Sequence, residues 1–443
     1  HQLAKEIAGE TIVLLKNQGS LLPLTAAKLA DKESILVVGE LAQKPRYQGI
    51  GSSQVNPTRL DNHYQALEDK FGEELELHYT PGYNSEAEPE ENESLKEKAL
   101  RVAENKDYVI IYAGLPEQAE AEGYDRQDMQ LPKEQNQLIK ELAAVNPNII
   151  VILNNGSAVD LRQWLDKVSA VIEAGLPGQA GASALADIIA GEINPSAKLA
   201  ESYPLKLEDN PSYLNFPGSS DSVRYGEGIY IGYRYYDKRK MEVLFPFGYG
   251  LSYTEFAYRA LEAPDYLAEG DKLKIKILIE NTGQFKGKEI IQLYLSQQNP
   301  SLARPPKELK GFGKIELEPG EKEWLELELD YQDLAYYHPQ AGWIVESDRF
   351  KIMIGASSRE IKFTEDIEVE SSFVLKDLTA KSPFEDWLAD PLGEKAVKEV
   401  LTEAEIEEIG FLKAWPLYRM HFFTPEQVSF EEIEEILDIY ENN

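Results

Sequence analysis

The chain has 443 residues, enough for two or three domains that each bury a full hydrophobic core. Asp and Glu outnumber Lys and Arg by 78 to 45, which gives a formal net charge of −33. A surface this acidic repels phosphate backbones and anionic lipid, so the composition argues against nucleic acid and membrane partners and favours a neutral substrate. No apolar run approaches the roughly 20 residues needed to cross a bilayer.

Metal and redox chemistry find little support in the composition. The chain has no cysteine, which excludes disulfides and thiolate metal sites and leaves no redox information about the compartment. Its five histidines share no metal-ligand spacing, so we expect neither zinc nor any other cofactor. Because the sequence opens on His1 and enters an amphipathic pattern from Leu3 to Leu15, we also expect it to start inside a longer polypeptide.

Residues 1 to about 215 alternate apolar strands with helical periods. Strands are expected at 35–39, 108–113, 149–153 and 168–172, and helices at 133–145 and 180–190. Such alternation predicts an α/β sandwich, a mostly parallel sheet covered by helices.

An acidic loop from Glu117 to Arg126 follows the strand at 108–113. In open α/β sheets, ligands bind beyond the carboxyl ends of parallel strands, so this loop is the first candidate for chemistry. It holds four carboxylates and one arginine. From composition alone, a solvated loop of an acidic protein is the alternative.

A second candidate loop, Arg46-Tyr-Gln-Gly-Ile-Gly-Ser-Ser53, follows the first strand. It lacks the third glycine of the dinucleotide fingerprint and the lysine of a Walker motif, which disfavours nucleotide binding. Gly49 and Gly51 would let the backbone approach a ligand or another domain closely, and Ser52 and Ser53 would then be the polar groups presented.

The remaining sequence divides into three parts. An aromatic-rich connecting segment at 216–255 is expected to pack domains together rather than to stack on sugars. Period-two strands with turns at 281–283 and 318–321 predict an all-β sandwich of immunoglobulin or fibronectin type at 256–370. Residues 371–443 form a helical C-terminal extension, with helices expected at 395–409 and 430–440.

Several motifs in this order resemble glycoside hydrolase family 3. Glu10-Thr-Ile-Val-Leu-Leu-Lys-Asn17, the Gly-Ile-Gly-Ser-Ser loop, Glu120-Ala-Glu-Gly-Tyr-Asp-Arg126 and Phe245-Pro-Phe-Gly-Tyr-Gly-Leu-Ser-Tyr253 are similar to its second domain. Arg304-Pro-Pro-Lys-Glu-Leu-Lys-Gly-Phe312 is similar to its fibronectin type III-like domain. The resemblance covers roughly residues 1–370, and the tail looks like an extension of bacterial β-glucosidases.

The resemblance implies a retaining glycosidase with two carboxylates roughly 5 Å apart. In the family, the nucleophile is an aspartate on an N-terminal TIM barrel, and the acid/base is a glutamate on the α/β domain. The family's Glu-x-x-x-Arg pattern falls on Glu122 and Arg126. Glu120 remains a competitor, because side chains two residues apart in an extended segment face the same way. Ser52 resembles a loop serine that reaches the sugar.

A general acid needs a raised pKa, so we expect negative charge from Glu117, Glu120 and Asp125 to raise the pKa of Glu122. Arg126 is expected to bind substrate together with Ser52, and to pair with Asp125 or to brace the loop.

No TIM barrel fits within these residues, and the nucleophile must then come from a separate barrel domain or chain. The implied function is the C-terminal half of a retaining β-glycosidase, foremost a β-glucosidase, acting on a β-glucoside or related neutral glycoside. The alternative is a non-catalytic module, derived from such an enzyme, that binds carbohydrate or a protein partner.

Overall fold

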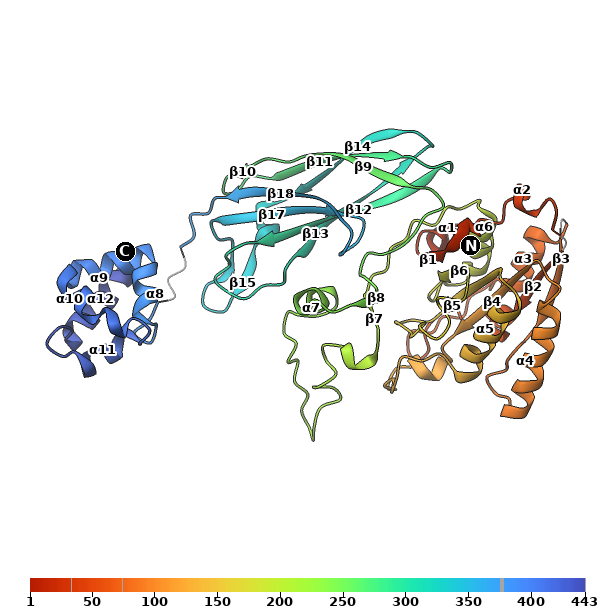
Figure 1. Ribbon diagram of the computed structural model, residues 1–443, viewed down its shortest axis with the longest axis horizontal. Helices are drawn as coiled ribbons and strands as arrows, with labels where there is room; N and C mark the ends of the chain where they lie inside the picture. The colour runs from red at the N-terminus through yellow and green to blue at the C-terminus, as the bar shows by residue number, and fades with distance from the viewer. Residues whose placement is uncertain (33, 74, 375–377, 443) are drawn as a thin grey trace. The chain divides into compact units, whose positions relative to one another are not determined.

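The computed structural model describes residues 1–32, 34–73, 75–374 and 378–442 (Figure 1). It divides into two compact units. The first comprises His1–Leu334 with Asp348–Val369, and the second comprises Ala335–Ser347 with Glu370–Asn443. No helix among the described residues is long and apolar enough to span a membrane.

A six-stranded sheet forms the centre of the N-terminal α/β domain. Its strand order is β1-β6-β5-β4-β2-β3. Strands β2 to β6 run parallel to their neighbours, whereas β1 pairs antiparallel with β6 at one edge. The predicted α/β class is therefore confirmed. The strands are β1 (Val13–Asn17), β2 (Ser34–Val38), β3 (Glu76–Thr80), β4 (Tyr108–Gly114), β5 (Ile149–Asn154) and β6 (Ala170–Glu173).

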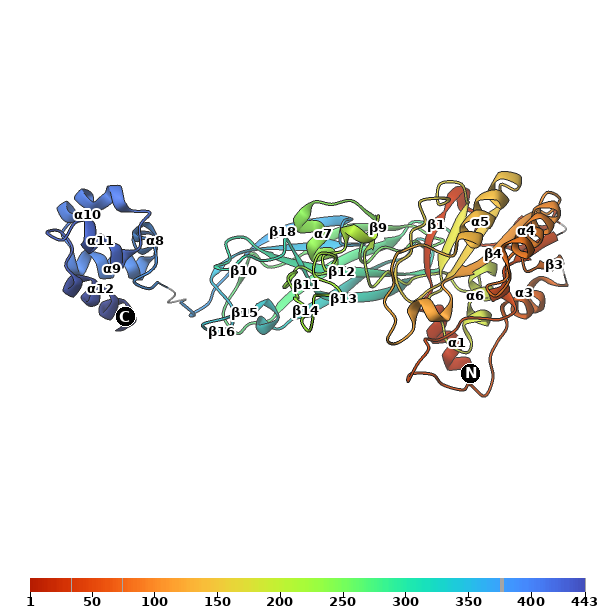
Figure 2. The same ribbon diagram turned by 90° about the horizontal axis from the view of Figure 1, so that it is seen from below.

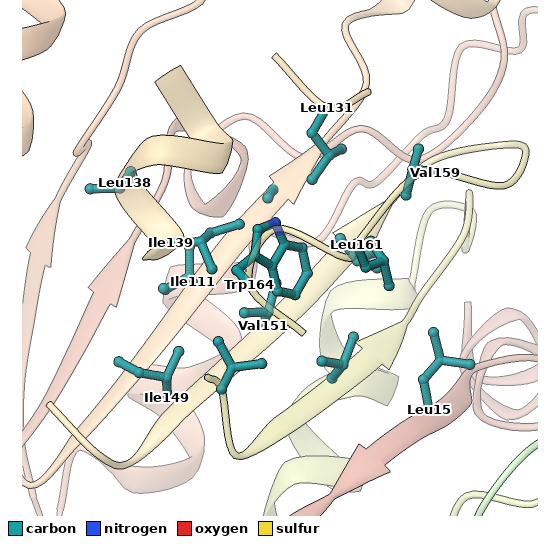
Figure 3. Packing of buried hydrophobic residues seen from close by; sticks show 14 of the residues in the cluster. Leu15, Ile111, Leu131, Leu138, Ile139, Ile149, Val151, Val159, Leu161 and Trp164 are labelled. Carbon is teal, nitrogen blue, oxygen red and sulfur yellow. The ribbon is translucent and has the colours of Figure 1, made fainter. Parts of the chain in front are cut away.

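Helices cover both faces of this sheet (Figure 2). One face packs against α1 (Gln2–Gly9), α3 (His63–Phe71) and α6 (Gly181–Ala190), and the other against α4 (Pro89–Ala103) and α5 (Lys133–Val145). Figure 3 shows Trp164 lying on the second face among Ile111, Val151 and Leu161. Its indole N–H donates to Asn136 Oδ1 at 2.9 Å, so this fully buried ring leaves no unpaired donor.

Only the first part of the N-terminal amphipathic segment is helical. α1 ends at Gly9, and Val13 to Asn17 form the antiparallel edge strand instead. Leu14 and Leu15 are buried on opposite faces of the sheet, which suits a covered strand as well as a helix. The sequence analysis also did not predict β3, α3 and α4, in which charged residues interrupt the apolar pattern.

The all-β domain is a sandwich of two sheets, as predicted. One sheet has the order β10-β18-β17-β12-β13 and the other β14-β11-β9. Along β11 the side chains alternate between buried and exposed or half-buried, as expected for a strand with one covered face. The strands are β9 (Phe256–Glu262), β10 (Tyr266–Leu267), β11 (Leu273–Asn281), β12 (Gly287–Gln297), β13 (Glu308–Leu317), β14 (Lys322–Leu329), β17 (Asp348–Gly355) and β18 (Ile361–Val369).

Aromatic residues before β9 tie the two domains of the first unit together. Tyr233, at the start of α7 (Tyr233–Arg239), stacks on Phe247 and meets Tyr294 of β12 edge-on. The Tyr249 and Tyr253 hydroxyls donate to the carbonyls of Leu15 and Ile188. The predicted packing role holds for these residues. Just before the segment and in its first part, in contrast, Tyr213, Leu214, Phe216 and Tyr225 are exposed.

The second unit joins a hairpin, β15 (Tyr336–His338) with β16 (Gly342–Ile344), to the helical tail. One helix was expected at 395–409, but the structure has two helices there, separated at Leu401 and Thr402. Thr402 begins a new helix there, because its side chain and Glu405 form a capping box. The tail helices are α8 (Phe384–Ala389), α9 (Pro391–Val400), α10 (Glu403–Ile409), α11 (Leu417–Phe423) and α12 (Phe430–Asn442).

Candidate active site

The acidic loop begins at the carboxyl end of β4, in the middle of the parallel sheet, as expected. Its first part is not extended, since Glu117–Glu120 form the short 3₁₀ helix η3. Glu120 ends this helix with its side chain only 9% exposed, whereas Glu122 lies on the surface. The expectation that the two carboxylates face the same way was therefore wrong.

Glu120 is bound to the body of the domain. Its carboxylate accepts hydrogen bonds from Arg46 Nη1 at 2.5 Å, from the backbone N–H of Gly156 at 2.9 Å and from Ser157 Oγ at 2.8 Å. The Arg46 side chain is 3% exposed. Burial alone would raise the pKa of Glu120, but these bonds and the arginine charge outweigh it and lower the pKa. Glu120 thus anchors the loop as a carboxylate.

Glu122 meets the glycine-serine loop. Its Oε2 accepts hydrogen bonds from Ser52 Oγ at 2.6 Å and from the Ser52 backbone N–H at 3.1 Å. Gly51 makes the approach possible: a Cβ on this residue would lie 2.7 Å from Oε2 of Glu122, and its φ of +99° also favours glycine. Gly51 thus permits a close approach, but to the candidate acid/base of the same domain instead of the expected ligand or second domain.

The pKa expectation for Glu122 was wrong in sign. The hydroxyl and the backbone N–H of Ser52 lower the pKa of this exposed carboxyl. Hydrogen-bond donors stabilise the charged form, while Glu120, two residues earlier in the loop, is already paired with Arg46. In this chain by itself Glu122 is therefore held as a carboxylate.

Arg126 braces the loop and does not pair with Asp125. Its Nη1 donates to Ser157 Oγ at 2.7 Å and to the Ala158 carbonyl at 2.9 Å. Burial lowers the pKa of Arg126, and Glu120 is the largest opposing charge. Glu120 and Arg126 therefore fix both ends of the Glu122 segment to the same turn, residues 156–158, after β5.

Sequence reasoning missed the residues that hold this loop. Arg46, Gly156 and Ser157 come from two other strand ends, and only Arg46 lay in a motif already singled out. Arg46 is only 4% exposed, which is unusual for an arginine. Its position next to the glycine loop is the one sequence signal that could have indicated a role in the site. The two hydrogen bonds that Glu122 accepts from this loop both come from Ser52 and not from Ser53, which was expected as a second polar group.

A buried glutamate, Glu173, is hydrogen-bonded to the residue that precedes the turn at 156–158. Glu173, at the end of β6, accepts hydrogen bonds from the Tyr203 hydroxyl at 2.7 Å, from Asn155 Nδ2 at 3.1 Å and from the Gly175 N–H at 2.9 Å. Burial raises the pKa of Glu173 to about 8, against the lowering effect of these bonds. Because Asn155 precedes Gly156, this network underlies the anchor of Glu120.

A cleft of about 900 Å³ lies beside the loop. Its lining combines aromatic and polar side chains, including Tyr124, Arg126, Asp128, Tyr213 and Phe216. Neither Ser52 nor Glu122 lines it. Among the described residues, no group of three or more His, Asp or Glu side chains is placed to hold a metal ion.

Two family models match the chain. The C-terminal domain of glycosyl hydrolase family 3 matches residues 12–253, and a fibronectin type III-like domain matches residues 289–358. The first match includes both loops that meet at Glu122.

Known proteins match over most of this chain. Thermostable beta-glucosidase B of Acetivibrio thermocellus is 41% identical over 100% of this chain and 60% of its own length. An exo-alpha-(1->6)-L-arabinopyranosidase of Bifidobacterium breve is 37% identical over 95% of this chain and 55% of its own length. The crystal structure of a Bifidobacterium adolescentis GH3 beta-glucosidase superimposes with a TM-score of 0.82 at 36% identity, covering 89% of this chain and 57% of that one. The chain thus spans between 55% and 60% of the length of these relatives.

Proposed function

Because this chain belongs to glycoside hydrolase family 3, we propose that it supplies the general acid/base half of a retaining β-glycosidase, a β-glucosidase in the first instance. Glu122 is the acid/base, and a TIM-barrel domain or chain outside these residues carries the nucleophile. One observation carries the choice of residue: Glu120 is buried against Arg46, whereas Glu122 is on the surface with Ser52 as its partner.

In the proposed mechanism, Glu122 first protonates the glycosidic oxygen while the nucleophile attacks the anomeric carbon. Departure of the leaving group produces a glycosyl-enzyme, and Glu122, now a carboxylate, takes a proton from the water that hydrolyses it. The first step needs a protonated Glu122. Exclusion of water and displacement of the Ser52 donors by barrel and substrate would raise its pKa. Ser52 would then be free to contact the sugar.

Exposed apolar side chains support the need for a barrel partner. Val55 and Tyr124, close in sequence to Ser52 and Glu122, are 65% and 70% exposed. On α1, Leu3 and Ile7 are 68% and 56% exposed, and His1 just before them bonds to Asp61. Exposed apolar side chains close in sequence to Ser52 and Glu122, and on the first helix, suit a covering domain.

Mixing experiments test the proposal. This chain, a TIM-barrel fragment from the Acetivibrio thermocellus relative, and the two together are assayed with p-nitrophenyl β-glucoside and with p-nitrophenyl α-L-arabinopyranoside. The second substrate is included because one relative is named for arabinopyranoside cleavage. We expect turnover only in the mixture. Turnover by this chain alone would refute the requirement for a barrel.

The alternative function is a non-catalytic carbohydrate-binding module, favoured by the aromatic and polar lining of the cleft beside the loop. Calorimetry of this chain alone with cello-oligosaccharides separates the two proposals. Millimolar or tighter binding, abolished by Tyr213→Ala with Phe216→Ala, together with inactive mixtures, would support the module.

A further inference from the structure

The helical tail contains an internal repeat. Pro383 and Pro416 face each other in an isolated antiparallel bridge. The surrounding backbone hydrogen bonds come in matching pairs, Phe384 N–H to Trp415 O with Leu417 N–H to Ser382 O, and Glu385 N–H to Lys413 O with Tyr418 N–H to Ala380 O. This pattern relates residues 380–385 to residues 413–418, which lie 33 positions later, as Phe384 to Leu417. Helix α8 therefore corresponds to α11.

The repeat shows which side chains the fold requires. Within α8 and α11 the buried positions are apolar in both halves: Trp387 and Met420 correspond and are both fully buried. Exposed positions differ. Trp415 and Phe422 of the second half stand where the first half has Ser382 and Ala389. Since the same fold accepts a small residue at both positions, folding does not explain these two aromatic rings.

Trp415 and Phe422 belong to two packed ring pairs, which we group with Phe411 under the name aromatic patch. Trp415 packs edge-on against Phe423 with ring centroids 4.5 Å apart, and Phe422 against Phe430 at 5.6 Å. At these exposures the patch presents roughly 500 Å² of apolar surface. Its members are Phe411 (75% exposed), Trp415 (36%), Phe422 (64%), Phe423 (56%) and Phe430 (45%).

The size of the aromatic patch suits a protein partner. A standard interface buries about 800 Å² on each side, somewhat more than half of it apolar. Roughly 500 Å² of exposed aromatic surface fills that share, and it is toward the upper end of what monomeric proteins expose. A single sugar ring would leave most of it in water.

The charges around the aromatic patch indicate which partner fits. Between Leu378 and Asn442 there are 16 Asp and Glu but only 5 Lys and Arg. Despite this excess of carboxylates, Lys413 and Arg419, which lie on the segment that carries the patch, form no ion pair with any described residue. A second copy of this chain would offer both an apolar patch and surplus carboxylates. In a two-fold contact, each pairing of Lys413 or Arg419 would form twice.

We propose that the aromatic patch is a two-fold contact through which two copies of this chain associate. Its rings bury one another, and Lys413 and Arg419 of each copy pair with carboxylates of the other. The net charge of −33 on each chain opposes association, so the dimer should be tighter at 0.5 M than at 0.05 M salt.

Sedimentation velocity with light scattering, from 1 to 100 μM, tests this proposal on the full chain. The expected mass is twice the 50.0 kDa of one chain at the upper concentrations. The triple variant Trp415→Ser, Phe422→Ala, Phe423→Asp takes the first-half residues at positions 415 and 422, removes the ring that packs on Trp415, and should weaken the dimer at least tenfold. Tyr337→Ser with Trp343→Ser removes another exposed aromatic pair, on the β15–β16 hairpin, and should leave the dimer unchanged.

The double variant Lys413→Glu, Arg419→Glu changes no ring of the aromatic patch. It tests the dimer contact if circular dichroism shows that the triple variant is unfolded. This double variant should also weaken the dimer at least tenfold. A monomer at 100 μM in both salts would overturn the proposal. A dimer that neither variant weakens would overturn it as well, because the contact would then lie elsewhere.

Discussion

Glu122 and Ser52 lie 70 residues apart in sequence, and Oε2 of Glu122 accepts hydrogen bonds from both the hydroxyl and the backbone N–H of Ser52. The contact joins the loop after β4 to the loop after β2, two neighbouring strands of the sheet. It also sets the protonation state of the proposed acid/base, because both donors favour the carboxylate. Ser52 thereby holds Glu122 in the state opposite to the one that the first catalytic step needs.

Removing the Ser52 hydroxyl should raise the pKa of Glu122 toward the ordinary glutamate value. Ser52→Ala deletes the shorter of the two hydrogen bonds and leaves the backbone N–H in place, so the shift should be upward and partial. Carbon NMR of the glutamate carboxyls during a pH titration measures it, with Glu122→Gln to assign the signal. Ser53→Ala is the matched control and should leave the titration unchanged. An unchanged pKa in Ser52→Ala would refute the contact.

Gly51 should tolerate no side chain. A Cβ there would lie 2.7 Å from Oε2 and 3.0 Å from Cβ of Glu122, and a φ of +99° is strained for alanine. Gly51→Ala should therefore displace Glu122 and lower the activity of the chain mixed with a barrel by at least tenfold. Gly49→Ala is the control, because its Cβ would meet only Ser53 Oγ at 3.8 Å. Equal activity of the two variants would show that the close approach is unimportant.

Glu120 should matter for stability. Glu120→Ala leaves the buried guanidinium of Arg46 without its carboxylate, a change that typically costs about 3 kcal/mol. Urea unfolding at pH 7 measures the loss, and Glu117→Ala, exposed on the same 3₁₀ helix, should change stability by less than about 0.5 kcal/mol.

The effect of Glu120 should also depend on pH. Because its folded pKa is lowered, its contribution is fully present above the unfolded pKa of about 4.3 and is lost as pH falls through the folded value. The stability gap between wild type and Glu120→Gln should therefore shrink at acid pH. A gap that stays constant down to the acid transition would contradict the lowered pKa.

Glu173 should give the opposite pH dependence. Its folded pKa of about 8 lies above the unfolded value, so its ionisation penalises the folded state progressively as pH rises from about 4.3 toward 8. Glu173→Gln should remove that slope and be relatively more stable at pH 8.5 than at pH 5, as measured by thermal unfolding. Glu104→Gln, on the surface at the end of α4, is the control. Parallel curves for Glu173→Gln and wild type would contradict the assignment.

Sequence patterns predicted the sheet and the position of the acidic loop well, because β2, β4 and β5 are uninterrupted apolar runs buried on both faces. The edge strand β1 was missed, since its buried residues Val13 to Leu15 continue a helical pattern from α1. The break at Leu401 was missed for a related reason, as a capping box joins two amphipathic helices without changing their apolar period.

Motif spacing placed Glu122 and Ser52 in the site but could not separate the roles of Glu120 and Glu122. That separation depends on Arg46, Gly156 and Ser157, which reach Glu120 from distant parts of the chain. The direction in which the pKa of Glu122 is shifted could not be predicted from sequence, because it depends on hydrogen bonds between two loops. The number of neighbouring carboxylates in the sequence predicted a raised pKa, which was wrong.

The most direct test of the central claim is azide rescue of Glu122→Ala. With the barrel fragment present, the variant should hydrolyse p-nitrophenyl β-glucoside at least 100-fold more slowly than wild type, because the glycosyl-enzyme lacks its general base. Azide needs no base, so it should restore turnover and give β-glucosyl azide as the product. Glu120→Gln should keep most of the activity and show no azide effect. Full activity of Glu122→Ala, or azide rescue of the Glu120 variant instead, would contradict the assignment of Glu122 as the acid/base.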